Sequence, residues 1–226
     1  MQQWVVIERR HTVKLYRPRY QKIKRALELL LCFLATPVLV PIAFLIVIAI
    51  RWDSPGPIFF VQDRVGKGGR LFKIIKFRTM HHNIDKEAHR TFMKEYINGR
   101  ITQPVGEKEV FKPFQANQVT HVGRILRKTS LDELPQLINV FRGEMSIVGP
   151  RPNVPWEVEE YQGWHQERLE VLPGITGLAQ VKGRSNIVFN TIVQYDIEYI
   201  KKQSLALDLK ILWWTVTSVF LSKGAH

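Results

Sequence analysis

Leu29 to Ile50 reads LLLCFLATPVLVPIAFLIVIAI, a run of 22 residues without a charged side chain. A continuous helix of this length is roughly 33 Å long, enough to cross the hydrocarbon core of a bilayer. The run begins too far from the N-terminus for a signal peptide, and no small-residue cleavage site follows it. A buried core helix is the alternative, but so long an apolar run has no polar face. The stretch therefore predicts a membrane-embedded helix.

Two prolines interrupt the middle of this run. Pro37 and Pro41 each remove a backbone donor and clash with the carbonyl group four residues earlier. We therefore expect the helix to bend or break near Thr36 and Pro37. The backbone groups freed at such a bend need partners, and the Thr36 hydroxyl is one candidate.

Both flanks of the run are basic. Residues 1–28 hold eight Lys and Arg against two Glu, and residues 51–80 hold seven against two Asp. A single span is expected to have one basic, cytoplasmic flank and one less basic flank. We therefore expect a segment that enters from the cytosol, turns near Thr36 and returns to the same face, which makes the protein monotopic. A kinked single span remains the alternative.

The composition of the chain excludes several classes of protein. Of its 226 residues, 45% are hydrophobic and 11% aromatic, enough to bury a core, so a disordered tail is excluded. The one cysteine, Cys32, cannot form an internal disulfide, which excludes a disulfide-stapled secreted scaffold. The formal charge is 33 − 20 = +13, which indicates an anionic partner: nucleic acid, a membrane surface or a phosphorylated substrate.

The patterns predict an α+β, mainly helical protein in three parts. Residues 1–23 form a basic extension, residues 24–50 the membrane helix, and residues 51–226 a cytosolic domain with an insertion at about 82–117. Two aromatic and β-branched runs, Ile58–Gln62 and Leu71–Phe77, flank a glycine-rich turn and predict a β-hairpin.

Two further stretches have helical patterns. Residues 122–140 are helical in pattern, with an interruption at Pro135. Residues 195–221 predict one amphipathic helix, which either packs on the core or lies in the headgroup zone of a membrane, where Trp213 and Trp214 beside lysines would fit.

The densest polar stretch is RILRKTSLDELPQ, from Arg124 to Gln136. Ser130 and Glu133 have the spacing of a capping box. This would explain Asp132 and Glu133, the acidic pair, as features of a helix start. The alternative is chemical. Arg127 and Lys128 favour the Asp132 anion, which could then attack a bound phosphate, while Glu133 supplies a hard oxygen ligand suited to magnesium.

Arg151 lies between two prolines, on a stiff backbone that loses little conformational freedom when a ligand binds. Such an arginine suits a bidentate phosphate clamp. A solvated arginine in a surface turn is the alternative. The histidines show no ligand spacing typical of zinc.

Five motifs in order resemble the monotopic phosphoglycosyl transferases, also called bacterial sugar transferases. The motifs are SPGPIFF from Ser54 with Gln62 and Arg64-Val-Gly, KFRTM from Lys76, SLDELPQLINV from Ser130, MSIVGPRP from Met145, and PGITGLAQV from Pro173 with Gly183-Arg184. The resemblance runs from about Lys24 to the C-terminus. It implies a re-entrant membrane helix ahead of a cytosolic catalytic domain with amphipathic interfacial helices, at the bacterial inner membrane.

The resemblance also implies a reaction. A sugar-1-phosphate passes from a UDP-sugar to undecaprenyl phosphate, UMP is released, and membrane-linked polysaccharide or glycoconjugate assembly begins. Asp132 matches the family's nucleophile, which forms a covalent aspartyl-phosphosugar intermediate. Glu133 matches its partner in the dyad, and both carboxylates are associated with Mg2+. The expected partners are the donor, the acceptor and membrane lipid, without nucleic acid; a homodimer is left open.

Further residues match family positions around the substrate. Arg127 and Arg151 match positions near the phosphates, with Lys76 and Arg78 as additional phosphate-binding residues. Gln180 and Arg184 match positions associated with the nucleotide or sugar.

Four residues depart from the family pattern: Glu28, Gln118, Leu172 and Lys182. None of these departures removes the dyad.

Two rival classes of protein would use the positive charge differently. A nucleic-acid-binding module would not need the membrane segment, and no recognition motif is present. A catalytically silent scaffold that binds anionic lipid would not need an intact dyad and Pro-Arg-Pro motif.

Overall fold

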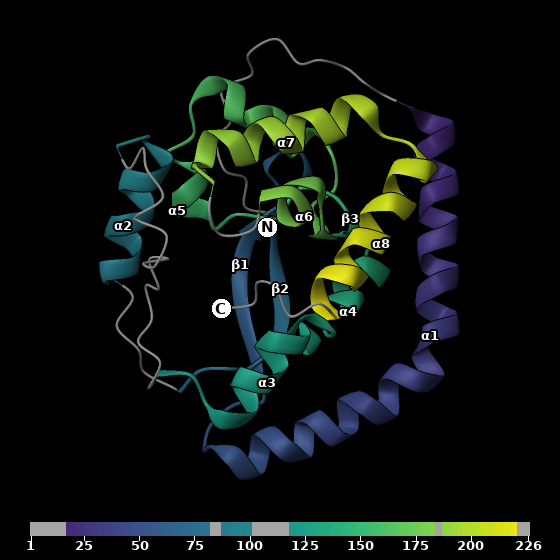
Figure 1. Cartoon of the computed structure of the whole chain (residues 1–226), viewed down its shortest axis with the longest axis vertical. Coiled ribbons are helices and arrows are strands. Elements are labelled where there is room, and N and C mark those ends of the chain that lie inside the picture. The colour runs from purple at the N-terminus through teal and green to yellow at the C-terminus, as the bar shows by residue number, and fades with distance from the viewer. Residues whose placement is uncertain (1–16, 82–86, 101–117, 184–186, 221–226) are drawn as a thin grey trace.

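The computed structural model describes residues 17–81, 87–100, 118–183 and 187–220. Its first element is α1 (Pro18–Asp53), a helix of 36 residues that contains the whole apolar run. Figure 1 shows α1 running along one side of the molecule and then turning beneath the other elements.

Two prolines, Pro37 and Pro41, lie near the middle of α1, where Figure 1 shows the helix bent. The helix continues through both prolines, so the predicted break near Pro37 takes the form of a bend. The Thr36 hydroxyl donates to the Cys32 carbonyl at 2.8 Å, a back-bond of the kind that bends helices. Thr36 therefore bonds the carbonyl four residues before it, and not the Phe33 carbonyl that Pro37 leaves without its usual donor.

Most of the apolar part of α1 is not covered by the described chain. In its most apolar window, with a mean hydropathy of 2.7, only 11% of the residues are buried. Large apolar side chains are exposed along both halves of the helix: Leu30, Leu31, Phe33, Leu34, Val38, Val40, Phe44 and Leu45. α1 is thus long and apolar enough to cross a membrane, and its surface is one that lipid would cover better than water.

The predicted β-hairpin is present at the centre of the molecule (Figure 1). β1 (Phe59–Val65) and β2 (Leu71–Phe77) are antiparallel, with Phe59 opposite Phe77 and Val65 opposite Leu71. The short 3₁₀ helix η1 (Lys67–Gly69) joins them, and Gly68 has a φ of 66°, the left-handed conformation that glycine adopts without steric cost.

Short helices and a second small sheet surround this hairpin. In chain order they are α2 (Glu87–Ile97), α3 (His121–Thr129), η3 (Leu131–Glu133), α4 (Gln136–Phe141), β3 (Ser146–Val148), α5 (Pro155–Val158), η4 (Gly163–Glu170), β4 (Gly174–Thr176), α6 (Leu178–Gly183), α7 (Phe189–Lys202) and α8 (Leu205–Phe220). β3 and β4 are parallel, with Ser146 opposite Gly174. α2 falls within the predicted insertion, and residues 101–117 of that insertion lie outside the described part of the chain.

The two halves of α1 pack on different parts of the domain. Cys32 of the first half joins a buried cluster with residues of β2, α4 and the turn before β3. Ile46 and Ile50 of the second half join another cluster with Phe77 of β2 and Leu126 of α3. The bend therefore lets one helix contact the domain along two sides.

The C-terminal stretch forms two helices, and the single helix expected over residues 195–221 is wrong. α7 ends at Lys202, and Ser204 caps α8 by accepting a hydrogen bond from the Leu207 amide at 3.2 Å. On α8, Ile211 is fully buried whereas Trp213 is 67% exposed. One face of α8 thus packs on the core and another is apolar and uncovered.

Candidate active site

The acidic pair lies in a tight turn between two helices. The Thr120 hydroxyl caps the start of α3 by accepting from the Gly123 amide at 2.9 Å. After α3, Ser130 has a φ of 57°, and Asp132 and Glu133 follow in η3. The Ser130 side chain makes no capping hydrogen bond, so the capping-box interpretation is wrong. The turn keeps both carboxylates out of a regular helix.

Two leucines hold this turn against the apolar helix α1. Leu131 and Leu134 flank the acidic pair, and both pack on the buried cluster formed with Ile46 and Ile50 of α1. The sequence Leu-Asp-Glu-Leu thus fixes the turn by its apolar ends. The two carboxylates are consequently placed next to the element most suited to lipid.

Two cations from distant parts of the chain contact Glu133. Lys76 of β2 places Nζ 2.7 Å from Oε1 of Glu133, and Nη1 of Arg151 lies 3.3 Å from the same oxygen. The Lys76 and Glu133 side chains are 14% and 18% exposed, whereas Arg151 is 49% exposed. Arg151 therefore keeps donors that a ligand can reach. The structure thus brings Lys76, Glu133 and Arg151 together.

Asp132 differs from its neighbour. Among the residues that the structure describes, its carboxylate has no hydrogen bond or ion pair. Burial raises the pKa of Asp132, the charge of Lys76 opposes that rise, and the charge of Glu133 adds to it. Burial would also raise the pKa of Glu133, but Arg151 and Lys76 outweigh it and lower that pKa. The pair thus contains one clamped anion and one carboxyl group that no described residue pairs with.

The loop that carries Arg151 is held by two other arginines. Arg64 of β1 donates to the Pro152 carbonyl at 3.0 Å. Arg168 of η4 donates to the Arg151 carbonyl at 3.3 Å and to Oδ1 of Asn153 at 2.9 Å. Arg168 is itself buried and paired with Asp196 of α7 at 2.5 Å. These contacts fix the backbone of the Pro-Arg-Pro element and do not engage the Arg151 side chain, which pairs with Glu133 and stays half exposed.

The other predicted site residues are less closely placed. Arg127, in the last turn of α3, is exposed, and its charge acts on Asp132. Arg78 is buried and donates to the Ser54 and Pro55 carbonyls at 2.6 and 2.9 Å, so it holds the turn after α1. Gln180 donates to the Ile175 carbonyl at 3.0 Å. Arg184 lies outside the described residues.

Arg64, Asn139 and Arg168 contribute to the site, although no role for them was predicted from the sequence. Arg64 lies near the site: the charges of Arg151 and Glu133 both act on it, and burial, followed by Arg151, lowers its pKa to about 10. The alternation of side chains along the hairpin could have identified Arg64. Phe60 lies opposite Lys76 and therefore on the same face of the hairpin, and Arg64 shares the face of Phe60 because an even number of positions separates them. Asn139 bridges the Ile75 amide and the Lys73 carbonyl, at 3.2 and 2.8 Å, which fixes the strand that carries Lys76.

The acidic pair offers a limited set of metal ligands. No group of three or more His, Cys, Asp or Glu side chains with metal-binding geometry occurs within the described ranges. Both cations contact Oε1 of Glu133, which leaves Oε2 and the Asp132 carboxylate as oxygen donors. Such a set fits Mg2+, which is commonly held by one or two carboxylates together with substrate phosphates and water.

These features define a class of protein. One carboxylate has no partner among the described residues, Lys and Arg hold a second, and an apolar helix packs against their turn. This arrangement suits a transferase that handles phosphate groups at a membrane. The chain belongs to the bacterial sugar transferase family, whose model matches residues 19–222.

Relatives cover most of the chain. It is 39% identical over 206 residues to the exopolysaccharide production protein ExoY of Sinorhizobium fredii, covering 90% of this chain and 88% of that protein. It is 38% identical over 211 residues to a UDP-glucose:undecaprenyl-phosphate glucose-1-phosphate transferase of Caulobacter vibrioides, covering 90% and 72%. An undecaprenyl-phosphate galactose phosphotransferase of Salmonella typhimurium is 42% identical over 172 residues, covering 76% and 35%. The resemblance in the motifs is confirmed: the chain is an enzyme, a glycosyl-1-phosphate transferase.

Proposed function

We propose that this enzyme transfers a sugar-1-phosphate from a UDP-sugar to undecaprenyl phosphate and releases UMP, which starts a membrane-linked glycan. The names of relatives support this donor and acceptor. The single observation that carries the mechanism is the Asp132 carboxylate, which pairs with no residue in the described part of the chain, beside a Glu133 that Lys76 and Arg151 clamp. A silent lipid-binding scaffold would not need this arrangement.

The proposed reaction has two steps at one phosphorus atom. In the first, an Asp132 oxygen bonds to the phosphorus that bears the sugar, and the bond from that phosphorus to the bridging oxygen breaks, so that UMP leaves. In the second, a phosphate oxygen of the lipid attacks the same phosphorus, and the Asp132 carboxylate is released. A covalent intermediate lets a water-soluble donor and a membrane-bound acceptor use one site in turn.

The cations of the site have separate roles in this scheme. Arg151 presents its accessible donors to the diphosphate, while Lys76 stays on Glu133 and keeps its charge next to the reacting centre. Arg127 adds positive charge at the rim. Asp132 and Oε2 of Glu133 would hold Mg2+, which when bound would neutralise phosphate charge. Since one phosphoanhydride replaces another, positioning and charge neutralisation are the main demands.

Mass spectrometry of the full chain in detergent tests the covalent route. The purified protein is incubated with magnesium and, separately, with the UDP forms of glucose, galactose and N-acetylgalactosamine, the sugars named among the relatives. Without acceptor, we expect one equivalent of UMP and a protein mass increased by one sugar phosphate. UMP formation that requires the lipid acceptor and leaves the protein mass unchanged would exclude the intermediate.

We also propose that both ends of α1 lie on the cytosolic face of the inner membrane, with α8 in the headgroup zone. Leu209, Trp213 and Val216 of α8 are all exposed and recur at helical spacing, so they form one apolar stripe. On α1, the exposed apolar side chains on both sides of the bend support a segment that enters and leaves the same face. Basic residues flank that segment at both ends.

Cysteine labelling tests this topology. Arg19→Cys and Trp52→Cys, each in a Cys32→Ser background, place a thiol at an exposed position near either end of α1. In inverted membrane vesicles a membrane-impermeant maleimide should label both. In spheroplasts, whose inner membrane is intact, the same reagent should label neither position. Labelling of the two positions from opposite sides would establish a single span.

A further inference from the structure

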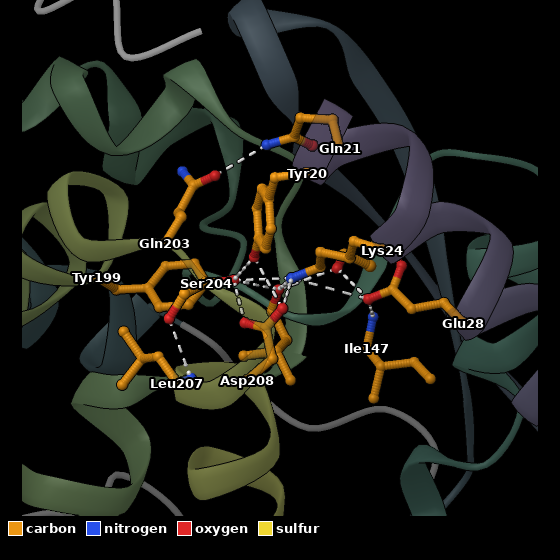
Figure 2. Close-up of polar contacts among 12 residues, drawn as sticks. Tyr20, Gln21, Lys24, Glu28, Ile147, Tyr199, Gln203, Ser204, Leu207 and Asp208 are labelled. Carbon is orange, nitrogen blue, oxygen red and sulfur yellow. Dashed lines mark hydrogen bonds and ion pairs between the residues drawn. The ribbon is translucent and has the colours of Figure 1, made fainter. Parts of the chain in front are cut away.

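Two charged side chains of the apolar helix α1 are turned into the protein. Lys24 and Glu28 are 7% and 6% exposed, although their helix is otherwise among the most apolar parts of the chain. Figure 2 shows Lys24 between Tyr199 and Asp208 on one side and Glu28 on the other, with Glu28 facing Ile147. Neither residue contacts the acidic pair, and the proposed reaction does not use them.

Lys24 is fully paired at the junction of three elements. Its Nζ donates to the Val148 carbonyl and to the Tyr199 hydroxyl, both at 2.7 Å, and lies 3.2 Å from Oδ2 of Asp208. The Tyr199 hydroxyl also donates to Oδ1 of Asp208 at 2.8 Å. Asp208 of α8 and, at 3.8 Å, Glu28 thus balance the charge of Lys24, while its hydrogen bond to the backbone goes to β3.

Glu28 also bonds to β3, at the residue that precedes Val148. Its Oε1 accepts from the Ser146 hydroxyl at 2.5 Å and from the Ile147 amide at 2.9 Å. All three residues of β3 are therefore bonded to α1 through side chains of one helical face. β3 is also paired with β4, and the Ser146 amide donates to the Pro173 carbonyl at 2.8 Å.

Anchoring the helix alone does not require charges. Replacing a buried ion pair by well-packed apolar residues is often neutral or stabilising, whereas hydrogen bonds to specific atoms fix a register that apolar packing leaves loose. The register in question is that of β3. Only Gly149 and Pro150 separate Val148 from Arg151, and the two prolines stiffen the connection. A shift of β3 is therefore passed on to Arg151.

We propose that Lys24 and Glu28 are positioning residues for Arg151: by fixing β3 against α1, they make the phosphate clamp at Glu133 depend on docking of the membrane helix. This rests on the proposed function in one respect, the role of Arg151. Arg168 holds the far side of the loop through the Arg151 carbonyl, so the loop is fixed from both ends. The membrane helix then serves as a structural part of the active site and not only as an anchor.

Glu28 offers a matched pair of variants. Glu28→Gln keeps an oxygen that can accept from the Ile147 amide and the Ser146 hydroxyl, while Lys24 keeps Asp208. Glu28→Leu leaves the Ile147 amide without its acceptor, and the Ser146 hydroxyl keeps only the Val148 carbonyl, at 2.9 Å. Leu27→Ala, at an exposed position on the same helix, is the control. Hydrogen exchange of the full chain in nanodiscs should be at least about tenfold faster at Gly149, Arg151 and Asn153 in Glu28→Leu. Glu28→Gln and Leu27→Ala should match the wild type there, and all variants should match it over α7.

Activity provides a readout that a merely structural role would not give. Because small misplacements of a catalytic group are costly, we expect Glu28→Leu to lower kcat/KM for UMP release by about 10- to 100-fold. In an Arg151→Ala background the same change should cost less than about twofold, since the group that it positions is gone. Unchanged exchange at residues 149–153, or an equal loss in both backgrounds, would overturn the proposal. Wild-type activity of Arg151→Ala would instead refute the proposed role of Arg151, and the exchange result would still stand.

Discussion

Asp132→Asn is expected to lower sugar-phosphate transfer by at least about 10³-fold, the scale seen when a catalytic nucleophile is removed. Asparagine has nearly the same size as aspartate, but its amide is neutral and a poor nucleophile. Because Asp132 makes no hydrogen bond or ion pair with the described residues, no structural contact is lost with its charge. The measurement is UMP release and intact protein mass with each of the three UDP-sugars. Neither UMP nor an adduct should accumulate.

A surface aspartate provides the control for this substitution. Asp63 of β1 pairs with Lys73 at 3.2 Å and is 57% exposed. Exposed ion pairs of this kind contribute only about 0–1 kcal/mol to the free energy of unfolding. Asp63→Asn should therefore form the adduct at the wild-type rate, and its melting temperature should match that of Asp132→Asn. If Asp132→Asn released UMP as fast as the wild type, Asp132 would not be the nucleophile.

Elements whose form depends on neighbouring residues alone were predicted from local sequence patterns. The hairpin from Phe59 to Phe77 was predicted because a glycine-rich turn separates two β-branched and aromatic runs. The bend in α1 was predicted because proline inside a helix has one dominant consequence. By contrast, β3 and β4 have three residues each, too few for a period of two to be recognised.

The turn at the acidic pair shows how a local rule can fail. The spacing of Ser130 and Glu133 favours a capping box, but Ser130 adopts the left-handed conformation, and the Glu133 side chain points to cations on other elements. Lys76 lies 57 positions before Glu133 in the sequence, so no local pattern could pair them. Only the family resemblance placed Lys76, Arg151 and the acidic pair in one site. The same resemblance suggested Arg78, whose donors hold the turn after α1.

The buried charges of α1 could not be interpreted from the sequence. Lys24 and Glu28 stood at the edge of the apolar run, where they were counted with the basic flank. Their partners come from β3, α7 and α8, more than 100 positions away. A single sequence gives no means to tell a solvated lysine at a membrane boundary from one that is buried and paired. The same limit applies to Arg168, which holds the Arg151 loop from η4.

Arg151→Ala is the second substitution with a large expected effect, a loss of about 10²- to 10³-fold in kcat/KM. The variant removes a half-exposed guanidinium from the diphosphate site and one of the two cations on Glu133. Arg151→Lys keeps the charge but loses the planar fork, so it should recover only part of the loss. Arg70→Ala, at an exposed position beside the hairpin turn, is the control and should behave as wild type. Wild-type kcat/KM in Arg151→Ala would contradict the clamp.

The pH dependence separates the charge of Arg151 from its geometry. Burial raises the pKa of Asp132, and Arg151 is one of three cations that lower it again. The nucleophile must be ionised, so activity falls as the pH drops through this pKa. Without Arg151 the pKa rises further, and the acid limb of the kcat/KM profile should move to higher pH. Arg151→Lys should leave that limb near its wild-type position while kcat stays low. An acid limb that stays in place in Arg151→Ala would mean that Arg151 acts on the substrate without influencing Asp132.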